Sequence, residues 1–95
     1  MAARTATPDA ETLALKALTF LANSPDDLAR FLNLSGIAPT ELRARAGDRD
    51  VLAGTLDFLL GQEPLLTRFC DSEMIDAKAV HVARAGLSTP AARAN

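Results

Sequence analysis

The chain repeats its own pattern at an interval of 38 residues. The segment that begins at Leu18 reads LTFLANSPDDLARFLNL, and the segment that begins at Leu56 reads LDFLLGQEPLLTRFCDS. A repeat of this length is typical of one supersecondary unit that cannot bury its apolar face alone, so two copies should share one interior. The recurring residues are Leu18, Phe20, Leu21, Arg30, Phe31 and Ile37, which return as Leu56, Phe58, Leu59, Arg68, Phe69 and Ile75.

The composition favours helices. Hydrophobic residues make up 48% of the 95 positions, and Trp and Tyr are absent. Ala and Leu, which are good helix formers, dominate the apolar positions, while Val and Ile, which favour sheet, are scarce. A chain of this length forms one domain. We therefore predict an all-α fold, a compact bundle of about six short helices arranged as two pseudo-symmetric three-helix repeats.

Two of the predicted helices, over residues 8–23 and 50–60, are apolar around most of their circumference. Such helices belong in the interior of a protein with only one edge in water. We expect the two to pack on each other at the centre, with their leucines meeting near a pseudo-two-fold axis. Their narrow polar stripes have the same spacing and consist of Thr12, Lys16, Thr19 and Asn23 in the first helix and Asp50, Gly54, Asp57 and Gly61 in the second.

Caps, prolines and glycines predict the remaining boundaries. We expect a flexible N-terminus over residues 1–8, a single helical domain over residues 9–86 with repeat units of about 9–47 and 48–86, and a flexible C-terminal tail over residues 87–95. The predicted signals are Thr7-Pro8 for the first helix, Ser24-Pro25 for the second, Ala38-Pro39 for a third that ends at Gly47, Glu63-Pro64 for the fifth, and Asp76 for a sixth that ends at Gly86.

The charge balance is that of an ordinary soluble surface. Twelve acidic and ten basic residues give a net charge of −2 at pH 7, which provides no long-range attraction for nucleic acid or an anionic membrane. No apolar run approaches the ~20 residues needed to cross a bilayer. A single cysteine cannot form an internal disulfide, which fits a reducing compartment. We expect a cytoplasmic monomer or weak homodimer that binds neither nucleic acid nor membrane.

Cys70 and His81 are the only thiol and the only imidazole. Cys70 falls where the first copy has Leu32, a core position at which cysteine acts as a small hydrophobe. His81 falls opposite Arg43, which indicates a solvent-facing edge. Pairs of acidic residues stand at predicted helix starts, where they interact favourably with free backbone N–H groups. We therefore predict no catalytic residue, no metal site and no cofactor.

Three residues are candidates for contact with a partner. Arg30 and Arg68 recur beside Phe31 and Phe69. We expect their stems to cover apolar surface and their guanidinium groups to bond the carbonyls of a neighbouring helix end, with an anion or carboxylate contact as the alternative. Gly54 lies inside a predicted helix, where glycine costs roughly 0.5–1 kcal/mol against alanine. Close approach of another helix would explain it, and a docking groove for a partner is the alternative.

A helix-turn-helix is the arrangement that would favour DNA binding. Arg43, Arg45 and Arg49 surround a predicted turn, and the helix over residues 50–60 would then enter the major groove. That helix is leucine-rich, and its exposed side chains should be two aspartates and Thr55. An acidic helix is unsuited to contact with phosphates, so we expect no nucleic-acid partner.

Three segments together resemble a family of small, mainly alphaproteobacterial proteins, the domain of unknown function numbered 3572. The segments read ALKALTFLANSPDDLARFLNLSG, LRARA and LAGTLDFLLGQEPLLTRFC, and the resemblance extends over about Ala10 to Gly86. It implies no activity, cofactor or catalytic residue. It does imply a gene beside response-regulator genes, which is an association with bacterial signalling.

The expected function is that of a small non-catalytic adaptor that binds another protein. The reason is that no set of reactive groups converges in the sequence. The first alternative is an enzyme or small-ligand binder with a pocket between the repeats, which would require a concave apolar cavity with a few inward polar groups. The second is a DNA-binding protein of the helix-turn-helix type.

Overall fold

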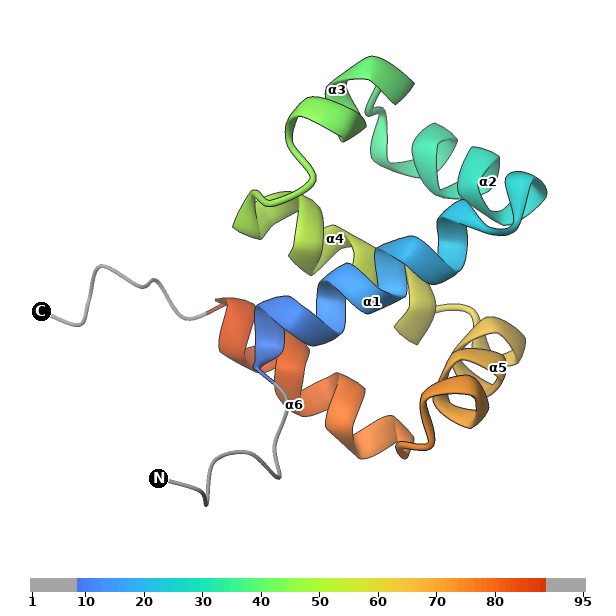
Figure 1. Ribbon diagram of the computed structural model, residues 1–95, viewed down its shortest axis with the longest axis vertical. Helices are drawn as coiled ribbons and strands as arrows, with labels where there is room; N and C mark the ends of the chain where they lie inside the picture. Colours follow the sequence, from blue (N-terminus) through green and yellow to red (C-terminus); the bar gives the residue numbers. More distant parts are fainter. Residues whose placement is uncertain (1–8, 89–95) are drawn as a thin grey trace, which may run out of the picture.

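The computed structural model describes residues 9–88, and over that range all regular secondary structure is α-helical (Figure 1). The prediction of an all-α bundle with six helices is therefore confirmed. The flexible N-terminus predicted for residues 1–8 lies outside the described residues, as does the predicted tail of residues 87–95 apart from its first two positions. Those two residues belong to α6, and Leu87 is buried, so the tail prediction is wrong there. The helices are α1 (Ala10–Ala22), α2 (Pro25–Ser35), α3 (Pro39–Ala44), α4 (Arg49–Leu60), α5 (Glu63–Glu73) and α6 (Ala77–Ser88).

Helices α1 and α4 cross at the centre of the bundle, as their apolar circumference predicts (Figure 1). Leu18 and Leu21 of α1 and Leu56 and Leu59 of α4 are all buried in one core cluster. Full burial of a leucine side chain contributes about 1.5–3 kcal/mol, so this crossing supplies a large part of the stability. The residues predicted to form the polar edge of α1, Thr12, Lys16, Thr19 and Asn23, are all exposed.

Helix α6 packs against both α1 and α4 and closes one side of the core. Val80, Ala83 and Leu87 form its buried face. The prediction that Gly86 ends this helix is wrong, because the helix continues beyond it and buries Leu87. Gly86 instead lies where α6 approaches α1, since a β-carbon built on it would stand 3.5 Å from the β-carbon of Ala10.

Two aromatic pairs join the flanking helices α2 and α5 to the crossed pair. Phe20 of α1 meets Phe69 of α5 with ring centroids 5.5 Å apart and ring planes at 61°. Phe58 of α4 meets Phe31 of α2 with ring centroids also 5.5 Å apart and ring planes at 60°. Such pairs add about 0.5–1.5 kcal/mol beyond their burial. Each ring of one pair stands 38 residues from a ring of the other, so both pairs connect the two predicted halves in the same way.

The third helices of the two predicted units differ. Helix α3 has 6 residues, none of them buried, and it is not among the closely packed helix pairs. Helix α6 has 12 residues and packs on both central helices. Leu42 of α3 is half-buried, whereas Val80 of α6 is fully buried. The aromatic pairs therefore follow the predicted pseudo-symmetry and the third helices depart from it, so the repeat stays a prediction.

The caps of α1 and α2 differ from those predicted. Helix α1 is capped by Asp9, whose carboxylate accepts the backbone N–H of Thr12 at 3.4 Å. The predicted cap, Thr7, lies outside the described residues. Ser24 stands at the N-cap of α2 as predicted, but its hydroxyl donates to the Asp27 carboxylate at 2.9 Å instead of accepting a backbone N–H.

Helices α2 and α5 both end on a residue in the left-handed region of backbone space. These residues are Gly36, with φ 74°, and Met74, with φ 58°. Glycine adopts this conformation freely, whereas a residue with a side chain pays roughly 1–2 kcal/mol. Met74 is 89% exposed, so its side chain gains little packing to offset that strain.

Replacement of Met74 by glycine should raise the free energy of unfolding by about 0.5–1 kcal/mol, because the backbone strain is released and little packing is lost. The matched change Gly36→Ala should lower it by about 1 kcal/mol for the opposite reason. Urea unfolding followed by circular dichroism measures both. A Met74→Gly variant no more stable than the native protein would contradict this account of the α5 terminus.

Candidate functional site

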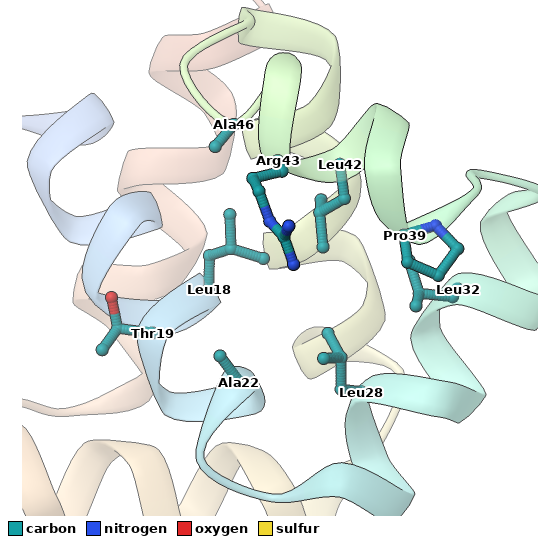
Figure 2. Close-up of a pocket in the computed structure, with 9 residues that line it drawn as sticks. All are labelled: Leu18, Thr19, Ala22, Leu28, Leu32, Pro39, Leu42, Arg43 and Ala46. Carbon is teal, nitrogen blue, oxygen red and sulfur yellow. The ribbon is translucent and has the colours of Figure 1, made fainter.

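An apolar groove with a volume of about 290 Å³ lies between α1, α2 and α3. Figure 2 shows Leu18, Leu28 and Leu42 reaching from the three helices toward the same open space. We call this surface the α1–α2–α3 groove. The residues that line it are Leu18, Thr19, Ala22, Leu28, Leu32, Pro39, Leu42, Arg43 and Ala46.

The groove is open to solvent because α3 does not bury a face against the rest of the bundle. Ala22, Pro39 and Arg43 at its rim are exposed, and the leucines contributed by α2 and α3 are only half-buried. Helix α3 begins at a proline and ends after 6 residues, so it offers few side chains with which to fill the space. Contiguous apolar surface of this kind is typical of a binding groove.

Arg43 is the one ionisable side chain in the lining of the groove. Within residues 9–88 it makes no hydrogen bond or ion pair, and Figure 2 shows its guanidinium group projecting between Leu18 and Leu42. Every other arginine in that range contacts a carboxylate. Those pairs are Arg30 and Arg68 with Asp27, Arg45 with Asp48, Arg49 with Glu11, and Arg84 with Asp57.

A second apolar groove, of about 390 Å³, lies between α1 and α6. Its lining includes Leu13, Ala79 and Val82. Ala10 and Gly86, which also line it, lie close to the two ends of the described range. We therefore place the candidate site in the α1–α2–α3 groove, whose lining lies well inside the described range.

The two recurring arginines converge on one carboxylate. Nη2 of Arg30 lies 3.4 Å from Oδ1 of Asp27, and Nη2 of Arg68 lies 3.4 Å from Oδ2. The Asp27 side chain is only 11% exposed, and Arg68 also lies over the ring of Phe20, 6.0 Å from its centroid. The predicted bonds to helix-end carbonyls are therefore wrong, because a buried acid in the first turn of α2 accepts both arginines.

The sequence held a signal for this role of Asp27. The 38-residue repeat places Asp27 opposite Leu65, which is a buried apolar position of the second copy. An acid at a buried position predicts that basic side chains lie beside it, because a buried charge is tolerated only when it is paired. The interaction of acids with free N–H groups at a helix start explains Asp26 and Asp27 equally well. It therefore does not indicate that only Asp27 is buried.

Asp27→Asn should lower the free energy of unfolding by about 1–2 kcal/mol, because it removes the charge that draws Arg30 and Arg68 together across α2 and α5. Asp26→Asn is the matched control, since Asp26 occupies the same helix turn but is exposed. It should change the stability by about 0.5 kcal/mol or less. Urea unfolding measures both effects. If the two changes lower the free energy of unfolding equally, the helix dipole explains both and the arginine contacts of Asp27 contribute nothing.

The close-approach explanation of Gly54 is wrong. Apart from its chain neighbours and the backbone of its own helix, no atom lies within 4 Å of a β-carbon built on Gly54. Gly54 instead lines a cavity of about 270 Å³ between α2 and α4, beside Phe31 and Val51. This cavity shares no residue with the α1–α2–α3 groove, so Gly54 is not brought together with Arg43 in that groove.

Cys70 and His81 are placed as the sequence predicts and do not line the groove. Cys70 is buried, and its burial raises the pKa of the thiol, with a further rise from the charges of Asp71 and Asp76. His81 is exposed on α6. Within residues 9–88, no three His, Cys, Asp or Glu side chains are grouped to hold a metal ion. In the same range, no helix has the length and hydropathy to cross a bilayer.

The Cys70 thiol should react with Ellman's reagent at about pH 8 at least tenfold more slowly in the folded protein than in urea, because burial disfavours the thiolate. The raised folded pKa also means that the unfolded chain loses this proton first, above about pH 8.5. The Cys70 contribution to stability should therefore decline as the pH rises above about 8.5, until the folded thiol also loses its proton. Cys70→Ala should remove that decline, and an unchanged pH profile in this variant would refute the assignment.

Two arginines join helices in ways that the sequence analysis did not anticipate. Arg49, at the start of α4, donates to Glu11 of α1 at 2.9 Å and to the Gly86 carbonyl of α6 at 3.0 Å. Its charge stands near the C-terminal end of α6, where the helix dipole favours a cation. Arg84 makes two bonds to Asp57, at 2.6 and 3.0 Å, and joins α6 to α4.

Helix α4 exposes only a narrow acidic edge, on which Asp50 and Asp57 lie, and this is unfavourable for the helix-turn-helix alternative. Thr55, which was expected to be exposed, is completely buried, and its hydroxyl donates to the Val51 carbonyl at 2.8 Å. Asp57 is held by Arg84. A central helix whose leucines form the core is poorly placed to enter a major groove.

The comparisons with known proteins bear on family membership alone. A family described as "Protein of unknown function (DUF3572)" matches residues 7–90. No curated protein and no solved structure matches the chain significantly. Since the family match spans all six helices of the described bundle, the protein belongs to the DUF3572 family.

Proposed function

We propose that the protein is a non-catalytic adaptor of the cytoplasm, and that its α1–α2–α3 groove binds an apolar segment of another protein. The observation that carries this proposal is the half-buried lining of the groove, with leucines from three helices around about 290 Å³ of open space. Removal of that apolar surface from water is favourable. A partner would therefore supply the contacts that α3 does not make.

Helix α6 shows the kind of contact that covers an apolar helix face in this protein. Helix α6 lies on α1 and α4 with Val80, Ala83 and Leu87 buried. Helix α3 buries none of its residues. Helix α6 thus covers both helices of the crossed pair, whereas α1 is left with a groove beside α2 and α3 that another helix could occupy.

The size of the groove supports an interaction with side chains. Ligand and cofactor pockets usually measure about 300–1,000 Å³ and enclose most of the ligand. A groove of about 290 Å³ with an exposed rim stands at the lower limit of that range. It suits one or two apolar side chains projecting from a larger body. Neither Cys70 nor His81 lines it, so the proposal assigns no catalytic role to either residue.

A random 16-residue peptide library displayed on phage, selected on the purified protein, provides the test. The blocking variant is Ala22→Gln combined with Leu42→Gln, because both positions line the groove and neither is fully buried. Synthetic versions of the selected peptides should bind this variant at least about tenfold more weakly than the native protein, since polar bulk replaces apolar surface. Fluorescence anisotropy measures the affinities.

Gly54→Ala is the matched control, because Gly54 lines the separate cavity between α2 and α4 and has room for a methyl group. The control should keep native affinity for the peptides. Thermal unfolding of all the variants verifies that they fold. Selected peptides that bind the folded blocking variant as tightly as the native protein, or a library that yields no binder, would end the proposal.

A further inference from the structure

Building on the proposed function, we infer that the partner of the α1–α2–α3 groove is an amphipathic helix with an acidic residue beside its apolar face, and that Arg43 pairs with that carboxylate. The inference concerns the chemistry of the partner. It rests on the state of Arg43 and on the kind of surface that surrounds it.

Among residues 9–88 Arg43 has no hydrogen-bond or ion-pair partner, whereas the other arginines of that range are all paired. Arg30, Arg45, Arg49, Arg68 and Arg84 all contact a carboxylate of the same chain. The Arg43 guanidinium instead projects between Leu18 and Leu42 (Figure 2). An apolar segment docked there would strip water from this charge, which is unfavourable unless the segment supplies an acceptor. A carboxylate accepts from guanidinium with the best geometry and strength among protein side chains.

The groove favours a helix over an extended segment. Its longer walls are α1 and α2, whose backbone N–H and C=O groups are bonded within each helix along most of its length. The one lining hydroxyl, that of Thr19, already donates to the Leu15 carbonyl at 3.0 Å. An extended segment would find few partners for its own backbone there, whereas a helix satisfies its backbone internally and presents apolar side chains at i and i+3 or i+4.

The experiment repeats the peptide selection on Arg43→Glu and on Arg43→Gln beside the native protein. Peptides selected on the native protein should carry Asp or Glu next to an apolar pair spaced i, i+3 or i+4. Those selected on Arg43→Glu should carry Lys or Arg there instead. For a synthetic native-selected peptide, a change of that acid to its amide should weaken binding about fivefold, and the difference should vanish on Arg43→Gln.

Lys78→Glu is the matched control. Lys78 is an exposed lysine that lines the second groove, so this change alters the net charge of the protein as much as Arg43→Glu does without touching the α1–α2–α3 groove. It should leave the acidic preference of the selected peptides unchanged. If Lys78→Glu alters the selection as strongly as Arg43→Glu, the preference comes from the overall charge and the inference falls.

The outcomes separate this inference from the proposed function. Peptides that depend on Ala22 and Leu42 but show no preference for an acid would overturn only the role of Arg43. Peptides that bind elsewhere would overturn both. Tighter binding of dodecanoate than of any selected peptide, with NMR shifts at Ala22 and Leu42, would assign the groove to an acyl chain and overturn the helical partner.

Discussion

The structure depends on the crossing of α1 and α4, two helices with too few polar residues to lie at a surface. Each has apolar residues around most of its circumference, so neither is stable in water unless other helices cover it. Leu21, Leu56 and Leu59 are completely buried as a result. Three of the other helices cover the crossed pair, with α2 and α5 on the flanks and α6 across one side (Figure 1).

The aromatic and ionic contacts around the crossing of α1 and α4 depend on direction, whereas the apolar packing of the core does not. Hydrophobic burial does not fix the angle at which helices meet, but an aromatic pair or a two-bond contact between guanidinium and carboxylate favours one geometry. Such contacts occur at each flank. Phe20 meets Phe69 and Phe31 meets Phe58, while Asp27 draws an arginine from α5 toward α2. The contacts of α2 with α4 and α5 also hold α2 in place as one wall of the α1–α2–α3 groove.

The sequence predicted much of the fold and less of the candidate site. The polar stripe of α1, the core position of Cys70 and the exposure of His81 follow from periodicity and from the comparison of the two copies. Gly86 was misread because a glycine near a helix end looks like a stop signal, whereas here it allows α6 to pass close to α1. The sequence does not distinguish Arg43 from the other arginines, because its distinction is that no side chain of the described bundle pairs with it.

The sequence by itself determined the helices and which faces they bury, because helix propensity, capping and apolar spacing act between residues that are near each other in the chain. Only the tertiary structure decided which charges meet and where the surface is left open. Asp27 and Arg68 are 41 positions apart, and their contact depends on how α2 and α5 lie on the crossed pair. The groove likewise exists because α3 is too short to cover it, and that can be judged only once the three helices have been placed.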